Sequence, residues 1–258
     1  MNYPLVPLEQ FQSFLLGLAR VAAMIAALPI FGSLQVPERV KAGLAICVAL
    51  LLAPLLAPLT PAQDLSLLEL TLILANEVLL GLLIGLTARL IFTAVELGGT
   101  VIGYQMGFAA ANVFDPQTQQ QLSLVTQFQN LFAMMVFLAL DGHHIFFSLI
   151  VESYQRLPPG PPAFAGETAE MLLRFTQHMF VLGIKFSAPI LAILLLSNTV
   201  LGIMARIFPQ LNVFLLSFPL NIGISLIVIA LTLNLTLLLL RREFDELGAR
   251  ILGLLSTL

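Results

Sequence analysis

Residues 98–116 read GGTVIGYQMGFAAANVFDP and lie between two strongly apolar stretches of the chain. Small residues recur in this stretch at every fourth position: Gly99, Gly103, Gly107 and Ala111. On a helix this spacing gives one face that is almost free of side chains, so another helix can approach it closely. The stretch then ends at Asp115-Pro116, a signal that stops a helix, and runs into a glutamine-rich tract. We therefore predict a glycine-faced packing helix followed by a loop.

The composition indicates a membrane protein. Of the 258 residues, 59% are hydrophobic and 10% are charged, and the mean hydropathy is +1.01. Soluble proteins average about 25% charged residues. The formal net charge of −3 offers no basic surface for a nucleic-acid backbone, so we expect no nucleic-acid partner. The single cysteine excludes an internal disulfide.

The chain contains six apolar runs close to the roughly 20 residues that a membrane-spanning helix needs. They lie at about 11–31, 42–59, 67–92, 124–151, 179–205 and 213–240. We predict an all-α fold of membrane-type helical hairpins, with some segments bent or broken. The sequence DGHH at 141–144 interrupts the fourth run and predicts two shorter helices there, and Pro189 predicts a kink in the fifth. The first run exceeds a signal-peptide core and has no Lys or Arg before it, so we expect it to stay in the mature protein.

We expect one domain over residues 1–258. A proline- and glycine-rich linker at 155–167 separates N-terminal helical hairpins in 1–154, which include the loop after the glycine helix, from a C-terminal helical pair in 168–258. Basic residues divide almost evenly between the two sides of six alternating spans, so their distribution does not set the topology.

Charged residues inside the apolar runs require partners. Glu77, Gly81, Gly85 and Arg89 are four residues apart and form one helical stripe, while Lys185 lies in a later run. About 18 Å of helix separates Glu77 from Arg89, so each needs a different partner or snorkels to the membrane surface. The glycines are candidates for close packing, either within the chain or in an assembly. Asn76, Asn198 and Asn234 offer further interhelical hydrogen bonds.

The sequence carries no recognisable catalytic motif. His143, His144 and His178 do not have the spacing of a zinc-binding helix, and we interpret His143 and His144 as part of a short turn. No nucleophile elbow or phosphate-binding loop is present in the sequence. We predict no catalytic residue, no metal ligand and no cofactor. A proton-coupled transporter using Glu77 and Glu96 stays open as a distant alternative.

The loop after the glycine helix is a candidate constriction. Phe108 and Phe114 flank Asn112, and glutamines follow the Asp-Pro stop. Polar backbone at membrane depth is tolerated only where it lines a cavity or is buried in protein.

Three stretches resemble the export-gate family of FliR, which has flagellar and virulence-injectisome branches. They are Arg20 to Gly32, Gly103 to Gln117 and Leu194 to Ile222, and they occur in family order. The most specific match is PQLNVF, and the motif residues are Arg206, Pro209, Gln210, Leu211, Asn212 and Phe214. This motif and GFAAANVFDPQ favour the flagellar branch, and Asn221 departs from the lysine expected in the injectisome branch.

The resemblance implies a single subunit in a spiral assembly with several copies of FliP and FliQ, next to FlhB and FlhA. This gate would lie in the bacterial inner membrane at the flagellar basal body, in contact with lipid, and pass unfolded flagellar proteins. The family's pore plug corresponds to about Phe108 to Gln121, which gives the candidate plug residues Phe108, Asn112, Val113, Phe114, Asp115 and Pro116. The homologous injectisome subunit is the near alternative.

Overall fold

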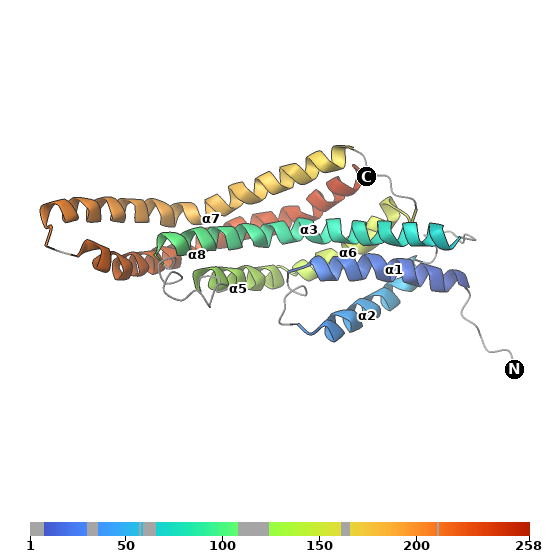
Figure 1. The fold of residues 1–258 in the computed structure, drawn as a ribbon. Helices are drawn as coiled ribbons and strands as arrows, with labels where there is room; N and C mark the ends of the chain where they lie inside the picture. The colour runs from blue at the N-terminus through green and yellow to red at the C-terminus, as the bar shows by residue number, and fades with distance from the viewer. Residues whose placement is uncertain are drawn as a thin grey trace. The chain divides into compact units, whose positions relative to one another are not determined.

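The computed structural model describes residues 8–29, 36–56, 58, 66–107, 124–160, 166–210 and 212–258. Within these residues the chain forms seven α-helices and no strand (Figure 1). The helices are α1 (Leu8–Ala27), α2 (Glu38–Leu56), α3 (Leu67–Gln105), α5 (Leu124–Ala139), α6 (Gly142–Arg156), α7 (Gly166–Ile207) and α8 (Val213–Leu255). The predicted all-α, membrane-type fold is confirmed.

The described chain divides into two compact units. Unit 1 comprises Met1–Leu90, Asp141–Phe175 and Phe244–Leu258. Unit 2 comprises Ile91–Leu140 and Thr176–Glu243. Each unit takes residues from both sides of 155–167, and helices α3, α7 and α8 contribute residues to both. The predicted division of the chain into residues 1–154 and 168–258, joined by the linker at 155–167, stays a prediction.

Fewer helices have membrane-spanning length than the six apolar runs predicted. Among the described residues, α3, α7 and α8 are long and apolar enough to cross a membrane. The fourth run is broken where DGHH predicted, because α5 and α6 are separate helices bent by 64° that count as one span only if taken together. The first run forms an apolar helix over Phe11–Ala27, which is shorter than a membrane span. Helix α2 is not among the helices long and apolar enough to cross a membrane. Pro189 lies inside α7 without ending it.

Helix α3 is longer than the third apolar run. It begins with a capping box, in which the Ser66 backbone N–H and hydroxyl both donate to the Glu69 carboxylate, at 2.8 and 2.7 Å. It then continues through Gln105, so Gly99 and Gly103 extend the same helix instead of starting a new one. The helix ends where Gly107 adopts a φ of 95°, the left-handed conformation that glycine accepts at a helix C-terminus.

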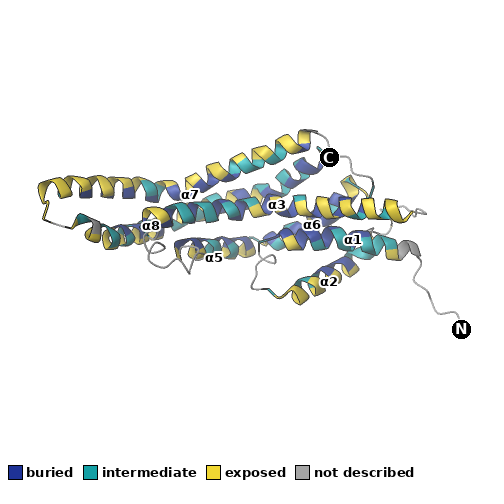
Figure 2. Ribbon diagram, viewed as in Figure 1, coloured by how far each residue is buried: buried dark blue, intermediate teal, exposed yellow. Residues whose placement is uncertain are grey.

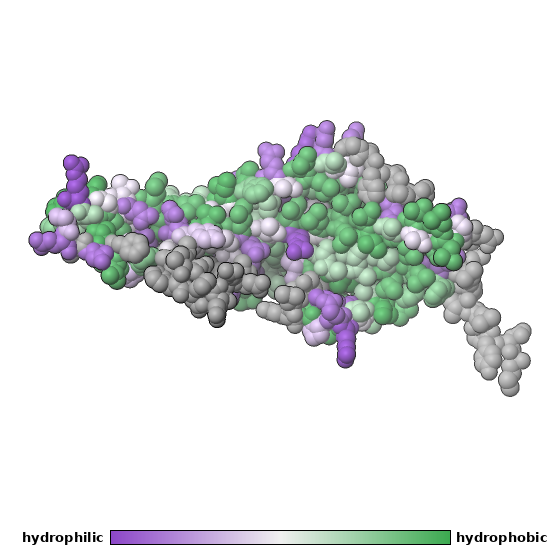
Figure 3. Space-filling model, in the orientation of Figure 1, coloured by the Kyte–Doolittle hydropathy of each residue, from purple (hydrophilic) through white to green (hydrophobic). Residues whose placement is uncertain are grey.

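The long C-terminal helices bury little of their apolar surface inside the chain. The most apolar window of α8 is 11% buried, compared with 56% for α3 and 39% for α7. Figure 2 shows exposed residues along α7 and at the turn between α7 and α8. Figure 3 shows that apolar residues cover much of the described surface in this view. Apolar surface of this extent requires hydrocarbon or other protein to cover it.

Candidate functional site

A fully buried ion pair lies at the centre of unit 1. Arg20 of α1 binds Glu77 of α3 through two parallel hydrogen bonds. The Arg20 Nε donates to Glu77 Oε2 at 2.6 Å, and Nη2 donates to Oε1 at 3.0 Å. Both side chains have 0% exposed surface. This bidentate geometry is the strongest form of a carboxylate–guanidinium contact.

Helix α6 completes this cluster, which we call the Arg20 cluster and define as Arg20, Glu77, Ser153 and Tyr154. Arg20 Nη1 donates to Ser153 Oγ, and Nη2 donates to the Leu157 carbonyl, both at 3.0 Å. The Tyr154 ring lies 3.7 Å from the guanidinium carbon of Arg20. The Tyr154 hydroxyl is 3.1 Å from Glu77 Oε2 and 3.2 Å from the Leu16 carbonyl, so it can donate to either.

The Arg20 cluster holds helices together and has no group free for chemistry. Burying a charged group is expensive unless it is paired and its remaining hydrogen bonds are satisfied. Here the guanidinium makes four hydrogen bonds, and the Glu77 carboxylate is neutralised by Arg20. Glu77 therefore does not snorkel. The arrangement positions α1, α3 and α6 relative to one another within unit 1.

The glycines of α3 in unit 1 lie against α1. A Cβ added to Gly81 would overlap the Arg20 carbonyl oxygen and lie 2.9 Å from the Ala23 Cβ. A Cβ added to Gly85 would overlap the Ala27 Cβ. These glycines bring α1 close enough for Arg20 to reach Glu77, so their close contacts are within the chain.

In unit 2, the glycines of α3 lie against α5 and α7. A Cβ on Gly99 would lie 2.7 Å from the Thr126 Cα of α5, and a Cβ on Gly98 would lie 3.0 Å from the Gly183 carbonyl oxygen of α7. Gly103 is buried. Gly107 lies against Phe218 of α8, whose ring would be 2.5 Å from an added Cβ. Ala111 lies outside the described residues.

The candidate plug residues Phe108, Asn112, Val113, Phe114, Asp115 and Pro116 all lie outside the described residues. Both ends of the chain around them are packed in unit 2. Met106 and Val125 belong to an apolar core with Ile102, Ile190, Leu194 and Ile229. A pocket of about 490 Å³ borders this core and is lined by Met106, Leu124, Val125, Phe128 and five residues of α8: Ile222, Leu226, Ile229, Ala230 and Leu233.

The family motif lies at the turn between α7 and α8. Arg206 is in the last turn of α7, Pro209 and Gln210 form the turn, and all three are exposed. The Asn212 side chain caps α8, since its Oδ1 accepts the Leu215 N–H at 3.3 Å. Leu211 and the side chain of Phe214 lie outside the described residues.

The remaining polar candidates lie elsewhere. Arg89 of α3 and Lys185 of α7 are exposed. The Asn76 Nδ2 donates to the Gly160 carbonyl at 3.1 Å. Asn198 joins α7 to α8, because its Oδ1 accepts the Asn221 Nδ2 at 3.0 Å. Ser197 Oγ donates to the Asn221 Oδ1 at 3.0 Å.

Sequence analysis did not identify Arg20, Ser153 or Tyr154 as site residues. A signal existed for Arg20, because it is a lone base inside the first apolar run, just as Glu77 is an acid inside the third. We compared Glu77 only with Arg89, which shares its helix. The predicted short turn at Asp141 is present, since Asp141 has a φ of 52° and its carbonyl accepts the His144 N–H at 2.8 Å.

Comparison with known proteins gives one consistent result. The family of bacterial export proteins, family 1, matches residues 11–247. The flagellar biosynthetic protein FliR of Bacillus subtilis (strain 168) is 34% identical over 242 residues, which cover 92% of each chain. That of Pectobacterium carotovorum subsp. carotovorum is 33% identical over 216 residues, covering 84% of this chain and 82% of the relative. That of Escherichia coli (strain K12) is 30% identical over 243 residues, covering 93% and 92%.

Proposed function

The chain belongs to family 1 of the bacterial export proteins and is a membrane protein of flagellar biosynthesis, and from this premise we propose that it is a channel subunit of the flagellar export gate. In this proposal, one copy assembles with several copies of FliP and FliQ in the bacterial inner membrane, next to FlhB and FlhA. The assembly passes unfolded flagellar proteins at the basal body. The subunit itself performs no enzymatic step.

The observation that carries the proposal is the apolar surface of α8. Its most apolar window is only 11% buried within the chain, although this window has the highest mean hydropathy of the three long helices, 2.5. A helix designed to pack inside its own chain would bury one face. This low burial supports a subunit whose long helices pack against other subunits and lipid.

The state of Glu77 argues against the proton-coupled carrier. A proton-coupled carrier needs carboxylates that face a water-filled pathway. The Glu77 carboxylate accepts two hydrogen bonds from Arg20 and has no exposed surface. The three relatives reported above are named as flagellar biosynthetic proteins, which favours the flagellar branch over the injectisome branch.

Extraction in mild detergent tests the assembly. We expect the chain to co-purify with FliP- and FliQ-like proteins, and native mass spectrometry should give one copy of it per complex. Recovery of the chain alone, or as a homodimer, under conditions in which FliP and FliQ remain associated with each other would contradict the proposal.

For the loop, we propose that residues Phe108 to Gln121 close the resting channel. A pore wide enough for an unfolded chain would dissipate the ion gradient if it stayed open, and apolar side chains can close a constriction by excluding water. In this role Phe108, Val113 and Phe114 obstruct the pore. Asn112 holds the loop by hydrogen bonds, and Asp115-Pro116 sets its turn. The contacts must be weak enough to yield to a substrate.

Ion leakage tests the loop. Deleting residues 112–118, or changing Phe114→Gly, should preserve the assembled complex and make expressing cells permeable to ions. Phe208→Gly is a matched control at an exposed position in the turn between α7 and α8. Tight membranes in cells that contain the assembled, loop-deleted complex would show that the seal lies elsewhere.

A further inference from the structure

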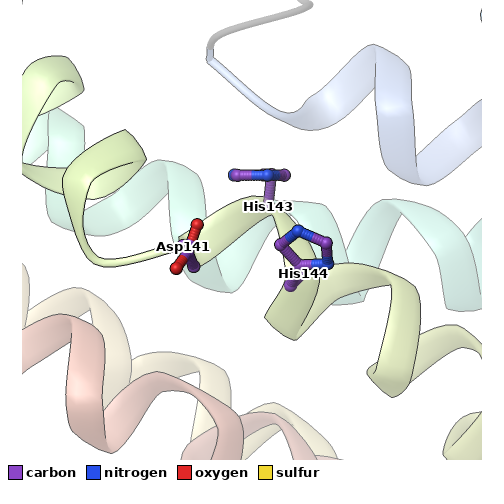
Figure 4. A group of neighbouring side chains, drawn as sticks. All are labelled: Asp141, His143 and His144. Atoms are coloured by element: carbon purple, nitrogen blue, oxygen red, sulfur yellow. The ribbon is translucent and has the colours of Figure 1, made fainter.

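Three side chains with metal-binding atoms gather at the start of α6 in unit 1. Asp141, His143 and His144 each offer one ligand atom, and these atoms all lie within 4.8 Å of one another. Figure 4 shows the three side chains on the turn and the first turn of the helix. Neither the Arg20 cluster nor the proposed channel uses them.

The turn itself explains why residues so close in sequence come together. Asp141 has a φ of 52°, a left-handed conformation that Asp and Asn accept more readily than most residues. The carbonyl of Asp141 then accepts the His144 N–H at 2.8 Å, which closes the turn. The two imidazole rings lie with centroids 4.4 Å apart. A search for histidines four residues apart on a helix does not detect this arrangement.

One atom of the group lacks an interaction that its burial requires. The His143 Nδ1 is buried and has no hydrogen-bond partner among the described residues. A buried polar atom without a partner is destabilising by about 1–3 kcal/mol, and such atoms in native proteins call for a water, an ion or a functional role. Coordination of a cation by the His143 Nδ1 itself would supply the missing interaction.

We propose that Asp141, His143 and His144 form a binding site for a divalent transition-metal cation of the zinc type. Imidazole nitrogens and a carboxylate oxygen are the ligands that zinc, cobalt and nickel share, whereas calcium and magnesium prefer oxygen alone. In a tetrahedral site, metal–ligand bonds of about 2.0–2.2 Å place the ligand atoms about 3.3–3.6 Å apart. The three ligand atoms, now within 4.8 Å of one another, would move closer together by side-chain rotation. Three protein ligands leave the remaining positions to water or to a fourth group.

Zinc binding to the full-length chain tests the site. The chain is purified in detergent, freed of any histidine tag, stripped with a chelator and dialysed against Zn²⁺, and bound metal is measured by mass spectrometry. We expect saturable binding of one zinc per chain that a large excess of Mg²⁺ does not displace. Cobalt should bind in its place and give a visible absorption spectrum with nitrogen and oxygen ligands.

Three conservative variants locate the ligands. His143→Gln, His144→Gln and Asp141→Asn should each weaken zinc binding by about tenfold or more. Asparagine accepts the same left-handed backbone, so Asp141→Asn preserves the turn. The control is His178→Gln, which removes the other histidine of the chain, one that hydrogen-bonds Glu243 at 2.8 Å in unit 2. Its zinc binding should equal that of the unmodified chain.

The proposal fails if the unmodified chain shows no saturable zinc binding. It fails equally if the three variants bind zinc as the unmodified chain does, or if His178→Gln loses binding to the same extent. Circular dichroism and gel filtration of each variant identify a misfolded protein. The cobalt spectrum of the unmodified chain gives a test that depends on no variant, because absence of a nitrogen-ligand spectrum contradicts the site.

Discussion

Each of the two units has its own kind of internal contact. In unit 1 the central contact is the Arg20 cluster, in which charge, hydrogen bonds and a stacked ring all converge on one guanidinium. In unit 2 the core is apolar and includes Ile190 and Leu194. Glycines allow close helix contacts in both units, but in unit 2 the buried Thr126 Oγ1 and Gln129 Oε1 have no hydrogen-bond partner among the described residues.

The difference indicates how each unit responds to change. Hydrogen bonds to a buried charge have fixed directions and lengths, so unit 1 has one arrangement that satisfies Arg20. Apolar contacts have no direction, and a core with buried polar atoms left unpaired gains if it can rearrange to pair them. We therefore expect unit 1 to behave as a rigid frame and unit 2 to adapt more readily when partners or substrates bind.

The largest expected effect comes from removing one charge of the Arg20 cluster. Arg20→Met should lower the free energy of unfolding by about 3–5 kcal/mol, because Glu77 is left charged and buried. Denaturant titration of the purified chain in detergent measures the loss. Adding Glu77→Leu should restore much of the stability, since both charges are then absent. A single Arg20→Met variant as stable as the unmodified chain would remove the basis of the comparison.

The second-largest loss of stability should come from shortening a side chain in the apolar core of unit 2. Leu194→Ala should destabilise by about 2–5 kcal/mol, because Leu194 has 0% exposed surface. Leu195→Ala is the matched control on the adjacent position, where the side chain is 65% exposed. The same denaturant titration should show little change for it. Equal losses would mean that the described core is not the one that stabilises unit 2.

Alanine substitutions at two glycines compare the stability effect of a Cβ placed against a neighbouring helix with that of a Cβ placed in open space. Gly81→Ala should destabilise by about 1–3 kcal/mol, because the new Cβ overlaps the Arg20 carbonyl oxygen. Gly202→Ala should instead stabilise the chain by about 0.5–1 kcal/mol, since nothing lies within 4 Å of an added Cβ and alanine favours a helix. Thermal unfolding measures both changes: the midpoint temperature should fall for Gly81→Ala and rise for Gly202→Ala. A tolerated Gly81→Ala would show that α1 can move away from α3.

The smallest expected changes in the free energy of unfolding come from Tyr154→Phe, inside the Arg20 cluster, and from Arg156→Ala, outside it. Tyr154→Phe removes one hydroxyl but keeps the ring against Arg20, so we expect a loss of about 0.5–1.5 kcal/mol. Arg156→Ala breaks an exposed pair with Glu152 and should change stability by less than about 0.5 kcal/mol. If Tyr154→Phe is as damaging as Arg20→Met, the hydroxyl is indispensable to the cluster.

Local patterns in the sequence predicted the local features of the fold. Apolar runs marked the helices, and DGHH marked the break between α5 and α6, because both depend on residues close in sequence. The glycine-faced helix was predicted, but not that it continues the helix of the third apolar run as far as Gln105. Glycines that weaken an isolated helix are tolerated there because neighbouring helices pack on them. The partner of Glu77 was missed because it lies 57 residues away, and no periodicity reports such a pairing.

The Arg20 cluster also has a consequence for the order in which the chain is made. Glu77 follows Arg20 by 57 residues and Ser153 follows it by 133. At a synthesis rate of about 5–20 residues per second, the arginine waits about 3–11 s for its carboxylate and about 7–27 s for α6. Arg20 therefore has no charged partner until α3 has been made, although α1 leaves the ribosome first.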